Sequence, residues 1–281
     1  MGRGSIGFGI VRSLDVVRGR LCLSELCGIL SDALGTLVIP YHPDSYAGLV
    51  GACERGDLGL AWLPPALAVK LADARRASVL ALPVRQGSVS YQSALIARVT
   101  GPASIDDLKG TRAAWVDQDS SSGYIMPRLF LEASKLDVAR LFGAERFVRT
   151  HGAVVAAVAS GQADVGATYC ATTNGASSSS RRPASEVHGP WTSALGANIA
   201  PTLAVLATTG AIPNDAIVVS NDLPAEVRGS VLRWLMSPHV GRSQVLCREL
   251  FDADVFRVAS ESHFAPLRRM LATARVPRGR A

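Results

Sequence analysis

Short apolar runs alternate with amphipathic segments along most of the chain. The apolar runs predict buried strands at 5–11, 37–40, 58–63, 90–99, 113–116, 164–167 and 204–208. Spacing of apolar positions and capping residues predict helices at 22–34, 45–55, 66–74, 104–110, 124–136, 154–160, 224–237 and 240–250. Strands that alternate with helices are typical of an α/β fold with mostly parallel sheets.

The run DQDSSSGYIMP, at 117–127, lies between the strand at 113–116 and the helix at 124–136. Such a junction leaves the first N–H groups of the helix without main-chain partners at its positive end. Ser120, Ser121 and Ser122 add hydroxyl donors there, and Gly123 removes a side chain that would keep a ligand from the backbone. This combination suits a small oxyanion such as phosphate. An ordinary N-cap in a serine-rich loop is the alternative reading of the same residues.

The composition is that of a globular protein with one large domain or two lobes. The chain has 281 residues, of which 48% are hydrophobic and 19% charged. No apolar run approaches the roughly 20 residues of a membrane span. The N-terminus shows no secretory leader. A stretch rich in serine, glycine and proline predicts a loop at 172–190.

The net charge is +6, and arginines are concentrated at the C-terminus. Five of them are Arg268, Arg269, Arg275, Arg278 and Arg280. Such a tail can bind nucleic acid or a membrane, but no base-reading motif accompanies it, so we expect no nucleic-acid partner. A basic protein also attracts small anions to a positive cleft.

Several kinds of site are missing from the sequence. The five histidines are scattered, and the five cysteines match neither a disulfide framework nor a zinc pattern, so we expect no metal. There is no nucleotide-binding glycine motif, and we expect no cofactor. The stretch DSSSG does not fit G-x-S-x-G, which argues against a serine hydrolase.

Five stretches resemble, in order, the phosphonate/phosphite/phosphate-binding proteins of ABC importers, which have the type 2 periplasmic binding-protein fold. They are DSYAGLVGACERGDLGLAWLPP at 44–65, SYQSALIARVTGPASIDDLKGTRAAWVDQDSSSGYIMPRLFL at 90–131, THGAVVAAVASGQADVGA at 150–167, AIPNDAIVV at 211–219 and LPAEVRGSVLRWLM at 223–236. The likeness spans about residues 5–240, and the stretch at 90–131 is the most specific.

The resemblance implies a two-lobed α/β protein with a hinge and an interlobe cleft. Lobe 1 would comprise 1–95 and 205–281, and lobe 2 would comprise 96–204. A small anionic ligand would lie between the lobes. The residues that match the family's binding positions are Tyr46, Tyr91, Ser120, Ser121, Ser122, Gly123, His151 and Asp215. For Asp215, a turn residue after Pro213 is an equally good interpretation.

The chain also departs from the family's pattern. Gly152 stands where the family has an aspartate after the binding histidine, and Ala171 stands where aminophosphonate binders have a glutamate. A carboxylate at the second position would meet a ligand ammonium group. Its absence argues against specificity for aminoalkylphosphonates.

The function implied is that of a non-enzymatic solute-binding protein that captures phosphate, phosphite or a phosphonate. An ABC-transporter permease would be its partner, outside the cytoplasmic membrane. Because no leader is visible, a cytoplasmic protein that senses the anion is the second version of this reading. The alternative class is an enzyme on the same fold acting on a small anionic metabolite. His151 is the one candidate for its base.

Overall fold

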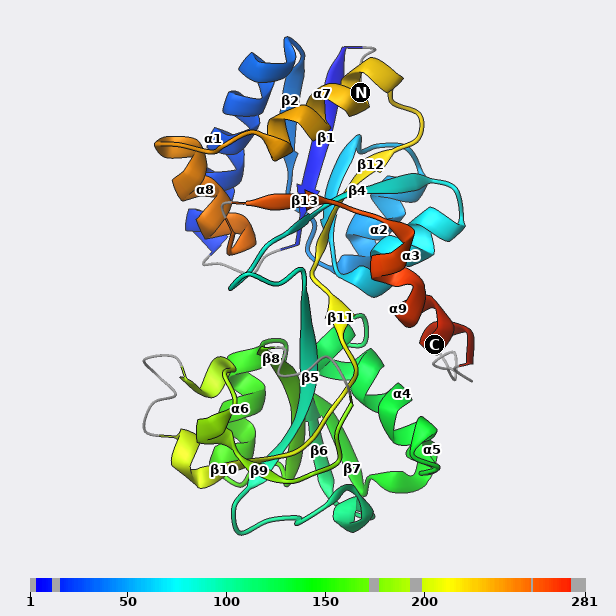
Figure 1. Ribbon diagram of the computed structural model, residues 1–281, viewed down its shortest axis with the longest axis vertical. Helices are drawn as coiled ribbons and strands as arrows, with labels where there is room; N and C mark the ends of the chain where they lie inside the picture. The colour runs from blue at the N-terminus through cyan, green and yellow to red at the C-terminus, as the bar shows by residue number, and fades with distance from the viewer. Residues whose placement is uncertain (1–3, 12–15, 172–176, 193–198, 254, 274–281) are drawn as a thin grey trace. The chain divides into compact units, whose positions relative to one another are not determined.

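A computed structural model describes residues 4–11, 16–171, 177–192, 199–253 and 255–273 of the chain. The chain folds into two compact units (Figure 1). Unit 1 combines residues 1–89 with 213–265, and unit 2 combines 90–212 with 266–281. The sequence predicted one lobe of 1–95 with 205–281 and another of 96–204. The boundaries between these lobes fall inside two strands of unit 2, Ser90–Arg98 and Leu203–Thr208. Which residues move together stays a prediction.

Unit 1 is built on one six-stranded sheet. Its strands and helices are β1 (Ser5–Ile10), α1 (Val16–Leu34), β2 (Leu37–Tyr41), α2 (Tyr46–Glu54), β3 (Leu60–Leu63), α3 (Pro65–Asp73), β4 (Ala77–Pro83), β12 (Ala216–Ser220), α7 (Ala225–Met236), α8 (Arg242–Phe251) and β13 (Phe256–Val258). The strand order is β13-β4-β12-β3-β1-β2, and β1 is parallel to both β2 and β3. The helix α9 (Glu261–Thr273) crosses the division between the units at Pro266.

Helices cover both faces of the unit-1 sheet. Ile6, Phe8 and Ile10 of β1 point into a core with α1, α7 and α8, which Figure 1 shows on one side of the sheet. Between them, Gly7 and Gly9 face the other way. A Cβ on Gly9 would lie 2.5 Å from Leu49 of α2, so these glycines allow the chain to pack closely against β1. Close packing of β1 thus accounts for both glycines.

Unit 2 contains the serine run. Its elements are β5 (Ser90–Arg98), a 3-10 turn (Ile105–Leu108), β6 (Arg112–Trp115), a π-helical turn (Ser121–Ile125), α4 (Met126–Ala133), α5 (Val138–Leu141), β7 (Ala144–Phe147), α6 (His151–Ala159), β8 (Val165–Ala171), β9 (Arg182–Pro183), 3-10 turns at Ala184–Glu186, Pro190–Thr192 and Ala200–Thr202, β10 (Leu203–Thr208) and β11 (Ile212–Pro213). The strand order is β7-β6-β8-β5-β10-β9, and β11 also pairs with β5.

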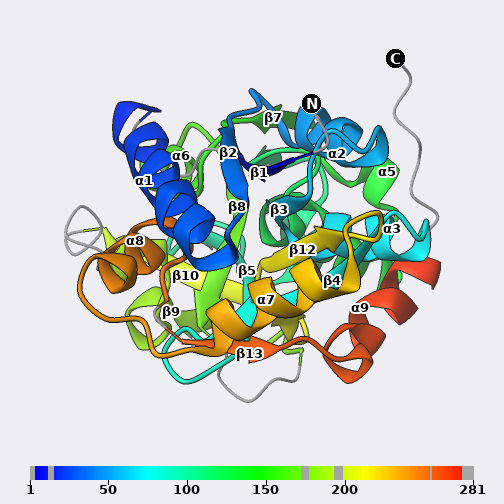
Figure 2. The same cartoon turned by 90° about the horizontal axis from the view of Figure 1, so that it is seen from above.

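The unit-2 sheet separates two cores. Ala94, Ile96 and Cys170 point toward α6, whereas Leu95 and Trp115 point toward α4 and α5. Figures 1 and 2 show these helices on opposite sides of the strands. Residues on both faces of the strands are therefore buried. The expectation of mostly parallel sheets is wrong: β1, β2 and β3 are parallel, as are β6, β7 and β8, but the other neighbours in the two strand orders are antiparallel.

The sequence predicted most of these elements, with exceptions. The helix expected at 22–34 begins at Val16, and the helix expected at 124–136 is a π-helical turn followed by α4, which ends at Ala133. Ser104 is confirmed as an N-cap: its hydroxyl accepts from the Asp106 N–H. Of the loop expected at 172–190, residues 172–176 lie outside the described part, as do Arg275, Arg278 and Arg280. Among the described residues, no helix is long and apolar enough to cross a bilayer.

Candidate functional site

Three parallel strands of unit 2 end at a common edge, which we call the unit-2 edge. β6 is parallel to both β7 and β8. The serine run follows β6, His151 begins the helix after β7, and β8 ends at Ala171. The antiparallel β5 starts at the same edge, and its Tyr91 pairs with Ala171. Open α/β sheets bind ligands at this end of their strands.

The serine run forms a π-helical turn with its N-cap, residues 120–125, which we call the serine turn. The Ile125 N–H donates to Ser120 O at 3.0 Å, and the Met126 N–H donates to Ser121 O. Both bonds span five residues and make the turn wider than an α-helix. Pro127 has no N–H and follows at the start of α4, a position that proline favours.

Two of the serine side chains, those of Ser120 and Ser122, differ in what they do. Ser120 Oγ accepts from the Gly123 N–H at 3.1 Å, so it caps the turn. Ser122 is 3% exposed, and its hydroxyl has no hydrogen-bond partner among the described residues. Its carbonyl accepts from Ser93 Oγ at 2.6 Å, which ties the turn to β5. The Ser122 main chain is thus held in place, and its hydroxyl can serve a ligand.

Gly123 has a structural reason other than the one expected. A Cβ at this position would lie 2.4 Å from Val116 Cγ2 and 2.8 Å from Ser120 Oγ. Packing thus accounts for Gly123 by itself, and the expectation that the missing side chain opens the backbone to a ligand stays a prediction. Gly123 lets the turn fold back against Val116, and the Val116 N–H donates to Gly123 O at 3.2 Å.

His151 is the first residue of α6, after the N-cap Thr150. Its Nδ1 lies 2.8 Å from Thr168 Oγ1 in β8, and its ring meets the edge of the Tyr169 ring at 4.9 Å between centroids. Burial lowers the pKa of His151 to about 4, so the ring is neutral at pH 7. With Nδ1 bonded to Thr168, Nε2 is the ring atom left for a ligand.

Tyr91 and Ala171 are cross-strand partners at the start of β5 and the end of β8. Directly opposite residues project to the same face of a sheet. The Tyr91 ring therefore leaves the sheet beside a methyl group rather than a carboxylate. Ser93 and Tyr169, the pair two positions further in, project to this same face.

The remaining expected residues lie at the corresponding edge of unit 1. Tyr46 is the first residue of α2, directly after the N-cap Ser45. Asp215 precedes β12, whose first residue pairs with the last residue of β3. The Asp215 carboxylate lies 3.7 Å from the Arg85 guanidinium. Burial raises the pKa of Asp215, and Arg85 acts in the opposite direction.

The structure thus divides the expected residues between two edges. The serine turn, His151 and Tyr91 share the unit-2 edge, whereas Tyr46 and Asp215 belong to unit 1. Sequence reasoning missed Ser93 and Thr168, which hold the serine turn and the histidine in place. The signal for both was a hydroxyl residue inside an apolar strand. The described residues contain no group of three His, Cys, Asp or Glu suited to a metal ion.

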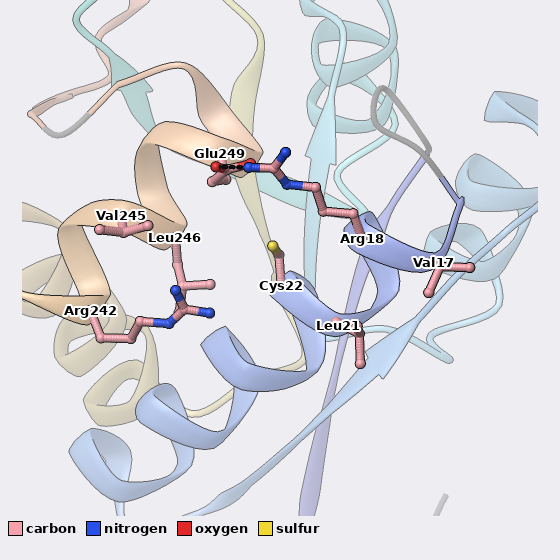
Figure 3. Close-up of a pocket in the computed structure, with 8 residues that line it drawn as sticks. All are labelled: Val17, Arg18, Leu21, Cys22, Arg242, Val245, Leu246 and Glu249. Atoms are coloured by element: carbon pink, nitrogen blue, oxygen red, sulfur yellow. Dashed lines mark hydrogen bonds and ion pairs between the residues drawn. The ribbon is translucent and has the colours of Figure 1, made fainter.

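A groove elsewhere in unit 1 lies between α1 and α8 (Figure 3). Leu21, Cys22 and Leu246 line it, and an ion pair between Arg18 and Glu249 crosses it. Cys22 and Leu246 belong to the helix-covered core of unit 1, not to the sheet edge with Tyr46. The groove is therefore separate from the candidate oxyanion residues.

A family model and a solved structure point to the same family of proteins. A family model described as "ABC transporter, phosphonate, periplasmic substrate-binding protein" matches residues 8–264. A binding-protein component of an ABC phosphonate transporter from Pseudomonas aeruginosa (PA3383) is 20% identical, with a TM-score of 0.74 over 96% of this chain and 86% of that chain.

Two further solved structures have the same fold. XAC2383 from Xanthomonas citri, bound to ATP, is 17% identical, with a TM-score of 0.78 over 96% of each chain. PhnD1 from Prochlorococcus marinus, in complex with methylphosphonate, is 18% identical, with a TM-score of 0.72 over 95% of this chain and 97% of that chain. Together with the two sheets, these similarities confirm the predicted α/β fold of periplasmic binding proteins.

Proposed function

The chain belongs to the family of periplasmic substrate-binding proteins of phosphonate ABC transporters, and on that premise we propose which residues bind the solute. Ser120, Ser121, Ser122 and Gly123 form the oxyanion loop. His151 and Tyr91 complete the part contributed by unit 2, and Tyr46 and Asp215 contribute from unit 1. The ligand is a small phosphorus oxyanion, and closure of two lobes around it brings the two sets together.

The observation that carries this proposal is the Ser122 hydroxyl, which belongs to a residue only 3% exposed and has no partner among the described residues. A hydroxyl with no partner in the protein keeps both its donor and its acceptor capacity for a ligand or a water molecule. A hydroxyl, the first N–H groups of the turn and a neutral imidazole are suitable donors to a tetrahedral anion. Ser120 contributes mainly by holding the turn, because its Oγ is already bonded to Gly123.

The ligand's substituent on phosphorus is small and uncharged in this proposal. The position beside Tyr91 is Ala171, which cannot pair with an ammonium group. Asp215 is the one carboxylate among the residues proposed for the site, and Arg85 already lies 3.7 Å from it. PhnD1 is described in complex with methylphosphonate, a ligand of this kind. We therefore favour phosphate, phosphite or an alkylphosphonate over 2-aminoethylphosphonate.

We further infer that the protein is not an enzyme and that its partner is an ABC-transporter permease. A substrate-binding family argues for both. The alternative, an enzyme acting on a small anionic metabolite, would use His151 as its base. A histidine whose pKa burial lowers to about 4 is a weak base near neutral pH.

A thermal-shift panel tests the proposal. The ligands are phosphate, phosphite, methylphosphonate, 2-aminoethylphosphonate and sulfate. A ligand at a hundred times its Kd should stabilise the folded protein by about 2.7 kcal/mol. We expect a shift with at least one of the first three ligands. Unchanged melting curves across the panel would reject the proposal and favour the enzyme.

A further inference from the structure

The donors proposed for the unit-2 edge carry no full positive charge. Serine hydroxyls and backbone N–H groups are neutral, and so is His151 at pH 7. Two carboxylates, Asp117 and Asp119, lie on the loop that leads into the serine turn. A phosphorus dianion would be repelled by both. The positive ends of helices offset part of this repulsion, but each supplies only about half a positive charge.

Arg149 is a cation at this edge. It lies between β7 and α6, two residues before His151. Its N–H donates to Val116 O at 2.9 Å, so the main chain is fixed against the start of the serine loop. Its side chain is 82% exposed, and Nη1 lies 3.8 Å from Asp117 Oδ2.

The backbone of Arg149 is strained. Its φ is +73°, in the left-handed region that glycine adopts without cost and other residues rarely occupy. Non-glycine residues held in such conformations are concentrated at functional sites. Glycine would fit this turn better, so the arginine side chain needs a reason of its own.

The pair with Asp117 is too weak to be that reason. A contact of 3.8 Å between an exposed guanidinium and a partly exposed carboxylate contributes little to stability. The other oxygen, Asp117 Oδ1, accepts from the Asp119 N–H at 3.0 Å, and this bond does not need Arg149. The guanidinium can therefore leave Asp117 at small cost, and Nη1 is poised beside the loop that carries the serines.

We propose that Arg149 supplies the positive charge of the oxyanion site by turning from Asp117 to an oxygen of the bound phosphorus anion. This inference rests on the function proposed above. A guanidinium suits the task because it presents parallel N–H donors to two oxygens of one phosphoryl group. It also explains how a loop with two carboxylates can accept a dianion.

The test compares Arg149→Gly with a matched control. Lys135 is also exposed and also has positive φ, +65°. It follows α4, whose eight residues extend about 12 Å away from the serine turn. Lys135→Gly thus removes the same charge and the same strain at a different place. Affinity for methylphosphonate and for inorganic phosphate is measured by calorimetry at low and high ionic strength, with melting temperature as the control for folding.

We expect both variants to melt at or above the wild-type temperature. Arg149→Gly should bind at least tenfold more weakly, with a smaller dependence on salt, and Lys135→Gly should bind like the wild type. If the wild type binds and Arg149→Gly remains within twofold of it, the inference is wrong while the proposed function stands. If the wild type binds neither anion nor any other member of the panel, both are rejected.

A second variant separates a cation that binds ligand from a structural ion pair. Asp117→Asn keeps an oxygen to accept from the Asp119 N–H but removes the charge that competes for Arg149. Affinity equal to or tighter than that of the wild type supports the inference. A loss as large as that of Arg149→Gly would instead mean that the ion pair holds the loop, and would overturn it.

Discussion

Removing the hydroxyl of Ser122 should weaken ligand binding without weakening the fold. Ser122→Ala keeps the carbonyl that accepts from Ser93 Oγ at 2.6 Å, and the lost hydroxyl has no partner among the described residues. Stability should therefore change by no more than about 0.5 kcal/mol. A hydrogen bond to a charged ligand is worth about 1.5–3 kcal/mol. The Kd should rise by roughly ten- to 150-fold.

Ser120→Ala is the informative comparison, because the two serines are neighbours with different partners. Ser120 Oγ caps the turn through the Gly123 N–H at 3.1 Å. Losing such a cap costs about 1 kcal/mol of folding stability. Urea unfolding and calorimetry with the best ligand of the panel are carried out on both variants. A Ser122→Ala protein with wild-type affinity and reduced stability would show that this serine, too, is structural, and the oxyanion reading would fall.

Three further predictions concern neighbouring positions. The free energy of unfolding should fall as the pH falls from about 6.5 towards 4, because His151 has a pKa of about 4 when folded and about 6.5 when unfolded. This free energy should change by at most about 1.4 kcal/mol per pH unit, and His151→Gln should reduce that dependence. Gly123→Ala, with its Cβ 2.4 Å from Val116, should cost about 1–3 kcal/mol, whereas Gly152→Ala, which meets nothing within 4 Å, should not destabilise; equal melting temperatures would contradict this. Ala171→Glu should raise affinity for 2-aminoethylphosphonate relative to methylphosphonate, and an unchanged calorimetric ratio would mean that this position is not near the substituent.

The sequence allowed the position of the serine turn to be predicted but not its form. A strand, a polar run and an amphipathic segment are visible in order, and they place Ser120–Gly123 at a strand end. The π-helical bonds depend on how the chain folds back onto Val116, seven residues before Gly123. No periodicity in the sequence records that contact.

Contacts between segments far apart in the chain could not be predicted from the sequence either. The bond between His151 and Thr168 requires α6 to lie along β8, and the bond between Ser93 and Ser122 requires β5 to reach the serine turn. Each joins segments that are unremarkable in isolation. The strand β4 was missed because it directly follows a predicted helix, and its pairing with β12 comes from more than 130 residues further along the chain.

The position of β12 within its sheet has a consequence for synthesis. β12 separates β3 from β4, yet it begins at Ala216, after every strand of unit 2 has been made. A growing chain therefore has what it needs to complete the second sheet first, although the first sheet was begun earlier. Until about residue 220 emerges, β3 and β4 have unpaired edges, the kind of surface on which nascent chains aggregate or recruit chaperones. Slowing translation just before β12 should prolong that vulnerable period, and pulse-labelled nascent chains should then show protease resistance in unit 2 before it appears in unit 1.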